Sequence, residues 1–274
     1  MTGIGETGKL QRRARRSKAL LVALAATLLT AAFASLAYAN LVQRGDLFVT
    51  FNGGISPTAL PRHQDAPISV ALSGTVKTLS GSPPSSLRQI TIELNRAGHL
   101  DTTGLPLCHV GQLEATSDAT ALSACRRALV GSGAFSAKVA FPEQPIIASH
   151  GTILAFNGRE GSRPVILAHI FGTEPLSITR IMVFHLRHTA GGYGTVFSGT
   201  LPPEILHYGY VTAIDLHLHR IFTYRGTTHS YLSAACTAPA GFSSAFFPFA
   251  RGSMTFEDGR TLTSTLTRSC KVRG

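Results

Sequence analysis

Two histidines and an aspartate at alternate positions are the residues best suited to chemistry in this sequence. Asp215, His217 and His219 lie within YVTAIDLHLHRIFTY (210–224). Because alternate side chains of a β-strand point to the same face, these three should face away from the apolar residues between them. Two imidazoles at this spacing can share a divalent metal ion, and a neighbouring carboxylate can complete or orient the site. The pattern indicates either a metal site or simply the wet face of an amphipathic strand.

The four cysteines favour disulfides over catalysis or metal binding. Cys108, Cys125, Cys236 and Cys270 form an even number, as expected for two disulfides in an oxidising compartment. Sequence order favours Cys108–Cys125 and Cys236–Cys270, although four cysteines allow three connectivities. No two cysteines are spaced as a C-x-x-C pair, which argues against a zinc site built from thiolates.

The sequence lacks the motifs of the common enzyme classes. It has no G-x-S-x-G elbow, no H-E-x-x-H, no Walker loop and no EF-hand loop. Its carboxylates are sparse, and the absence of tryptophan argues against sugar stacking. A metal-dependent enzyme or metal-binding protein using His217 and His219 is the alternative that remains in this class. No other catalytic residue or cofactor is expected.

Alternating patterns after residue 40 predict the β-strands that position these residues. They are rich in Val, Ile, Thr, Phe and Tyr and are separated by Gly, Pro, Asn or Asp. Asp258-Gly259 is the strongest hairpin signal, and Asn52-Gly53 and Asn157-Gly158 are weaker turn signals. About twelve strands are expected, which favours an all-β fold, an antiparallel β-sandwich. The clearest segments are 67–79, 87–95, 133–141, 150–157, 163–173, 178–188, 193–201, 210–224, 229–236 and 251–266.

One segment, SDATALSACRRALVG (117–131), predicts a short helix. Ser117 or Asp118 is expected as its N-cap, and Gly131 is expected to end it. Its apolar face includes Cys125, which should point toward the sheet and within reach of the preceding loop. The helix is therefore expected to be a structural lid held to the sheet by a disulfide.

The N-terminal residues predict export. A basic stretch (QRRARRSK, 11–18) precedes an uncharged apolar run at 19–39, whose end Ala37-Tyr38-Ala39 fits a small-x-small cleavage site. Either the segment is a signal peptide cleaved after Ala39, or it is an N-terminal anchor helix retained in the membrane, because its length lies between the two cases. Both place residues 40–274 outside the cytoplasm, in the cell envelope or the extracellular space.

The net charge of +11 overstates the charge of the exported part. Residues 1–18 carry six Lys and Arg and one Glu, so the rest has 19 Lys and Arg against 13 Asp and Glu, a net charge of +6. This excess forms no basic stripe and no nucleic-acid module, so nucleic acid is not an expected partner. An anionic wall polymer or membrane surface is the partner class that mild positive charge favours outside the cell.

Residues 40–274 are expected to form one body, or two abutting halves with a boundary near 142–149. The second possibility rests on the recurrence of Phe-Asn-Gly at 51–53 and 156–158, each followed by an apolar strand containing Gly-Thr. No long Pro-, Ser- or Gly-rich linker separates the halves.

Three stretches resemble a group of exported β-rich proteins from high-GC Gram-positive bacteria. They are GDLFVTFNGGISPTALPRHQDAPISVALSG (45–74), LDTTGLPLC (100–108) and the region from SYLSAACTAPAGF to FPFARGSMTF (230–256). The resemblance implies export and β structure and transfers no catalytic residue, because the group has no assigned activity. We therefore expect an exported, non-enzymatic binding or structural module.

Overall fold

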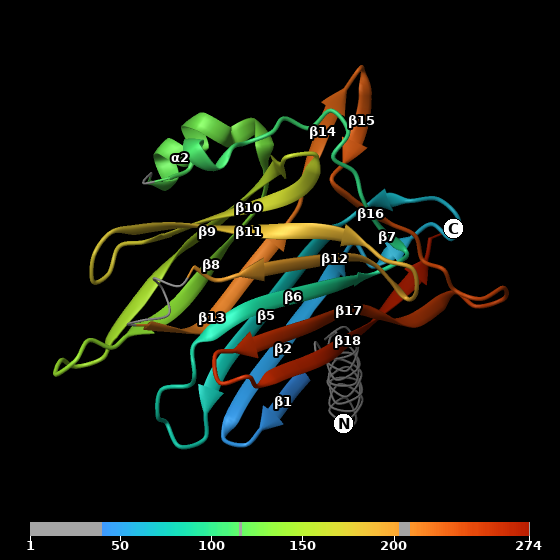
Figure 1. Cartoon of the computed structure of the whole chain (residues 1–274). Helices are drawn as coiled ribbons and strands as arrows, with labels where there is room; N and C mark the ends of the chain where they lie inside the picture. The colour runs from blue at the N-terminus through green and yellow to red at the C-terminus, as the bar shows by residue number, and fades with distance from the viewer. Residues whose placement is uncertain (1–39, 115–116, 203–208, 274) are drawn as a thin grey trace, which may run out of the picture. The chain divides into compact units, whose positions relative to one another are not determined.

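The structure, a computed structural model, describes residues 40–114, 117–202 and 209–273 (Figure 1). The export segment expected at residues 1–39, with Ala37 and Ala39, lies outside the described residues. Within the described ranges, no helix is long and apolar enough to cross a membrane. Contacts group the described residues, from 40 to 273, into one compact unit.

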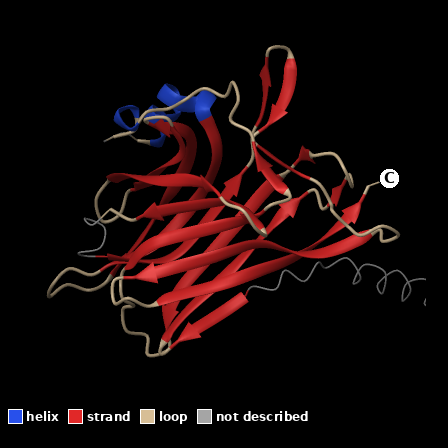
Figure 2. Cartoon of the chain, turned by 45° about the vertical axis from the view of Figure 1, so that its right-hand side comes forward, coloured by secondary structure: helices blue, strands red, loops and turns tan. Residues whose placement is uncertain are grey.

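Thirteen of the described strands form one sheet that curls into a half-barrel (Figures 1 and 2). Neighbouring strands are antiparallel, except that β18 and β3 are parallel. In spatial order the strands are β1 (Asn40–Arg44), β2 (Leu47–Ser56), β5 (Ser69–Thr78), β13 (Gly209–Leu218), β8 (Leu129–Val139), β9 (Ile147–Glu160), β10 (Arg163–Gly172), β11 (Ile178–His188), β12 (Tyr193–Thr200), β6 (Leu87–Asn95), β17 (Ser244–Phe256), β18 (Thr261–Val272) and β3 (Ala59–Leu60).

Two small sheets and a helical segment complete the described fold. A three-stranded sheet contains β4 (Ala66–Pro67), β16 (Leu232–Ala234) and β7 (Gly98–Leu100), and a projecting hairpin contains β14 (Ile221–Tyr224) and β15 (Thr227–Ser230) (Figure 1). The helical segment consists of the 3-10 turn η1 (Val110–Gln112), the helix α2 (Asp118–Cys125) and the 3-10 turn η2 (Arg126–Ala128).

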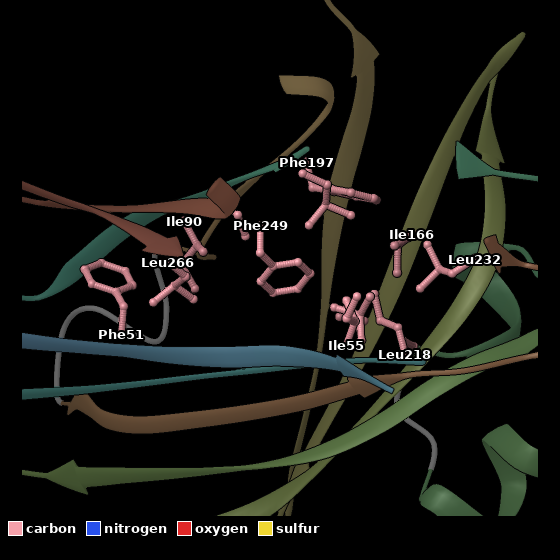
Figure 3. Close-up of a cluster of buried hydrophobic side chains, with 14 of the residues drawn as sticks. Phe51, Ile55, Ile90, Ile166, Phe197, Leu218, Leu232, Phe249 and Leu266 are labelled. Carbon is pink, nitrogen blue, oxygen red and sulfur yellow. The ribbon is translucent and has the colours of Figure 1, made fainter. Parts of the chain in front are cut away.

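The expected all-β class with one short α-helix is confirmed, and each of the ten expected segments contains strand residues. The thirteen hydrogen-bonded strands continue as one curled sheet, so the architecture is not plainly a sandwich of two separate sheets. Inward-facing side chains from different parts of the curl nevertheless meet in a common core, as in a sandwich. Figure 3 shows Phe51, Ile90 and Leu266 clustered there.

Arg268, a side chain of β18, connects that strand to β2. Arg268 donates from Nε to the carbonyl oxygen of Gly53 (2.5 Å) and from Nη2 to Asn52 Oδ1 (2.9 Å). A Cβ on Gly53 would lie 2.6 Å from the carbonyl oxygen of Ala71 on neighbouring β5, so the close approach requires glycine. The expectation that Asn52-Gly53 forms a turn was therefore wrong, because the pair lies inside β2 where β18 packs against it.

The other two turn signals have opposite outcomes. Asp258-Gly259 forms the turn between β17 and β18, with Gly259 at a φ of 82°, as expected. Asn157-Gly158 instead lies inside β9. The backbone N–H of Cys108 donates to the Asn157 carbonyl oxygen (2.9 Å), and Asn157 Nδ2 donates to the Pro106 carbonyl oxygen (3.1 Å). This Asn-Gly pair marks the docking of a distant loop onto a strand.

Replacing Arg268 with methionine is expected to lower the free energy of unfolding by about 2–3 kcal/mol. The change removes two hydrogen bonds from a charged group and leaves the Gly53 carbonyl oxygen without that donor. The guanidinium of Arg268 is partly withdrawn from water, and this burial lowers its pKa. Denaturant unfolding measures the effect. The exposed Arg88→Met on β6 should change stability by less than about 0.5 kcal/mol; equal stability losses in both variants would contradict a holding role for Arg268.

The helix α2 is shorter than expected. Ser117 is its N-cap and accepts a hydrogen bond from the backbone of Thr120 (3.4 Å), as the sequence predicted. The chain leaves the helix after Cys125 and enters β8 at Leu129, so the prediction that Gly131 ends the helix was wrong. Gly131 instead pairs with β13. The register of the sheet, a non-local interaction, overrides the helical pattern there.

Both disulfides favoured by sequence order are present. The Cα atoms are 5.6 Å apart in Cys108–Cys125 and 5.7 Å apart in Cys236–Cys270. The first ties the loop before η1 to α2, on the outer face of β9 and β10, and the second ties the loop after β16 to β18. All four cysteines are buried. Two such bridges are compatible with an oxidising, extracellular location.

Candidate functional site

Two of the three predicted metal ligands lie on one face of a strand. Asp215 and His217 are exposed on the outer side of β13, and His219 is exposed just beyond its end. Their neighbours offer little support for a metal, because His217 lies opposite Ala71 of β5 and Ser132 of β8. Among the described residues, no group of three or more His, Cys, Asp and Glu side chains is arranged to hold a metal ion. A site made by the two histidines alone stays a prediction.

The same alternation turns Ile214 and Leu216 of β13 inward, where they line an apolar space. Three adjoining cavities lie inside the half-barrel, with volumes of ≈ 120, ≈ 70 and ≈ 20 Å³. Phe184 of β11 and Leu216 line all three, so the cavities adjoin one another, and we call them together the chamber. Other side chains that line two of the cavities are Leu72, Ile90, Ile92, Ala168 and Ile214.

The chamber lies between two flanks of the curled sheet. Leu72 of β5 and Ile214 of β13 approach it from one flank, and Ile90 of β6 and Phe184 of β11 approach it from the other. Protein interiors are normally packed to the density of organic crystals. Here several inward-facing apolar side chains are only partly buried, which shows that the two flanks do not fill the space between them. These side chains are Leu72, Ile92, Phe135, Ile170, Phe184, Ile214 and Leu216.

Small inward residues contribute to the open space. Ala137 of β8, Ala168 of β10 and Ala250 of β17 all line the chamber. Apolar side chains that stay unpacked forgo the contacts and the exclusion of water that stabilise a protein core. A bound apolar molecule would supply both.

Two polar side chains line the largest cavity. Ser149 of β9 is buried and donates from Oγ to the carbonyl oxygen of Glu174 (2.6 Å), so its hydroxyl proton is engaged. Arg180 of β11 donates from Nη1 to the carbonyl oxygen of Thr179 (2.8 Å). A mainly apolar pocket with a few placed polar groups is the usual form of a small-molecule binding site.

A buried histidine pairs with a carboxylate under the helix, which the sequence did not indicate. His169 of β10 is fully buried, and its Nδ1 lies 3.3 Å from Asp118 Oδ1 at the start of α2. The hydroxyl of Thr152 on β9 donates to the other oxygen of Asp118. The cluster fixes the first turn of α2 on the outer face of the sheet, away from the chamber. We therefore assign it a structural role.

A second histidine–carboxylate pair anchors the projecting hairpin. His229 of β15 stacks on Phe222 of β14, and its Nδ1 lies 2.9 Å from Asp101 Oδ2. Burial acts to raise the pKa of Asp101. The hydrogen bonds from the Thr103 backbone and from His229 outweigh burial and leave the pKa below its usual value. The ionised carboxylate thus stabilises the folded state.

Asp101→Asn is expected to lower the free energy of unfolding by about 0.5–1 kcal/mol at pH 7, because Asp101 is only partly buried. The folded-state pKa lies below the unfolded value of about 3.9, so this contribution is present above pH 3.9 and disappears as the pH falls through the lowered pKa. Denaturant titrations of both proteins at pH 7 and pH 2.5 check this. A stability difference that is as large at pH 2.5 as at pH 7 would contradict the ionic role of Asp101.

Comparisons with known proteins yield no match. No protein-family model, no curated protein and no solved structure matches the chain. The function of the protein is therefore inferred from the chamber and its lining residues.

Proposed function

We propose that this protein is an exported binding module that holds a slim apolar ligand in the chamber. The observation that carries this proposal is the row of inward-facing but only partly buried apolar side chains around three adjoining cavities. In this proposal the two flanks of the half-barrel act as the two layers of a sandwich, and the ligand completes the packing between them.

The size of the chamber limits the ligand. The ≈ 120 Å³ cavity approaches the roughly 150 Å³ of an engineered apolar cavity that binds benzene. All three cavities together remain below the roughly 300 Å³ typical of the smallest pockets for drug-sized molecules. Three small adjoining cavities favour an unbranched chain of several carbons over a fused ring system.

Export and binding support each other physically. An apolar molecule outside the cell is shielded from water when a protein encloses it, and each buried methylene contributes about 0.8 kcal/mol. The two disulfides suit a protein that works in that compartment. The basic and apolar residues 11–39 provide the export signal in this proposal. Metal binding at His217 and His219 and attachment to an anionic surface are separate predictions, and the chamber requires neither.

Calorimetric titration with 1-octanol, a neutral single-chain molecule, tests the proposed function. 1-Octanol should bind saturably, with one molecule per chain. Titrations at several temperatures should give a negative heat-capacity change, the signature of apolar burial. Absent or non-saturable binding of 1-octanol would refute the proposal.

A further inference from the structure

We propose that the ligand is a single-chain amphiphile with an anionic head group, a carboxylate or a phosphate monoester, and that Arg180 binds this head. This inference rests on the proposed function, because the chamber must first accept the apolar tail. The chemistry of one inward-facing arginine supplies the head-group specificity.

Arg180 faces the interior of the half-barrel. In the sheet it pairs with Ile170 of β10. Met182 and Phe184, two and four residues further along β11, lie on the same face of the strand as Arg180. These residues and Arg180 line the largest cavity. A charged side chain among such neighbours is unusual, because an apolar residue at this position would bury more favourably. Its presence points to a function in the site.

The guanidinium of Arg180 has donors available for an anion. Nη1 donates to the adjacent Thr179 carbonyl oxygen, whereas Nε is buried and donates no hydrogen bond. Among the described residues, no Asp or Glu forms an ion pair with Arg180. Buried polar groups are normally hydrogen-bonded, so an unsatisfied Nε requires an explanation. A carboxylate or phosphate fits because two of its oxygens match the forked donors of arginine.

The surroundings of Arg180 also define an orientation for the ligand. Arg180 lines both the largest cavity of the chamber and an open cleft of ≈ 600 Å³. The cleft contains polar side chains, among them Ser117 and Ser177, and one carboxylate, Glu114. Glu114 does not line the chamber. The tail is therefore placed in the chamber and the head at Arg180, where the apolar lining gives way to a wet cleft.

The test compares octanoate and octyl phosphate with 1-octanol, which has the same chain and no charge. Wild-type protein should bind at least one of the two anions at least tenfold more tightly than 1-octanol. Arg180→Met should abolish this preference and leave the affinity for 1-octanol within about twofold. Arg180→Lys should restore part of it, because the charge returns without the forked geometry. Arg187→Met, exposed on the same strand, is the matched control and should keep the full preference.

The outcomes separate this inference from the proposed function. Octanoate preference alone identifies a carboxylate head, and octyl phosphate preference alone identifies a phosphate head; both support the inference. Equal binding of 1-octanol and both anions to wild type overturns the inference and leaves the proposed function standing. Loss of 1-octanol binding in Arg180→Met also overturns it, because Arg180 is then a structural residue. If wild type binds none of the three, the proposed function itself fails.

Discussion

Ala137→Phe is expected to weaken the binding of 1-octanol about 10- to 100-fold. Ala137 of β8 points into the largest cavity of the chamber, where a phenyl ring would occupy the space of the ligand tail. Each methylene kept out of the chamber loses about 0.8 kcal/mol, and 1.4 kcal/mol corresponds to a factor of ten. Excluding two or three methylenes accounts for the expected loss. The ring fills existing space, so folding should be preserved.

The same substitution on the other face of β8 provides the control. Ala134 is exposed on the outer side of the strand, three residues from Ala137. Ala134→Phe introduces the same ring into the same strand and should leave the affinity for 1-octanol unchanged. Calorimetric titration with 1-octanol measures both variants, and circular dichroism confirms their folding. Equal affinities in the two folded variants would show that the ligand does not occupy the chamber.

Removing the Cys236–Cys270 disulfide is expected to produce the largest loss of stability, about 4 kcal/mol. The two cysteines are 34 residues apart. Opening this loop raises the conformational entropy of the unfolded chain, and the gain, which destabilises the folded state, increases with loop length. The bridge connects the loop after β16, which follows the small three-stranded sheet, to β18 at the edge of the half-barrel. Both parts should therefore loosen together in Cys236→Ala/Cys270→Ala.

The second disulfide provides a comparison for this measurement. Cys108 and Cys125 are 17 residues apart, and their removal is expected to cost about 3 kcal/mol. Hydrogen exchange should locate the effect of Cys108→Ala/Cys125→Ala in α2, on the outer face of the sheet. Denaturant midpoints of both double variants test the order of the two effects. A larger loss for the shorter loop would contradict the chain-entropy explanation.

The sequence predicted the strands well because their main signal is local. Alternation of apolar and polar residues located the region of β5 and the strands from β8 to β13, and Asp258-Gly259 located the last hairpin. β2 was missed because Asn52-Gly53 is also a common turn dipeptide. Its role depends on Arg268, 215 residues away from Gly53, and no local pattern reports such a contact.

The sequence predicted candidate residues only on the outer face of β13, and it did not predict the chamber on the inner side. Asp215, His217 and His219 are polar at alternate positions, so their shared exposure follows from the strand period alone. The chamber depends on whether Leu216 and Phe184, from opposite flanks, fill the space between them. That depends on the curl of the sheet and on small residues at facing positions. The inward arginine Arg180 was the one available signal, since it interrupts an otherwise apolar inner face of β11.

A crystal structure of the protein with 8-bromooctan-1-ol, a neutral chain that bromine makes visible by anomalous scattering, tests directly whether the chamber binds an apolar chain. We expect an alkyl chain and a bromine peak inside the half-barrel, in contact with Phe184 and Leu216. Bromine found only on the outer face of the sheet would contradict binding in the chamber. So would crystals in which the chamber's own side chains close it, if the same protein binds the compound in solution.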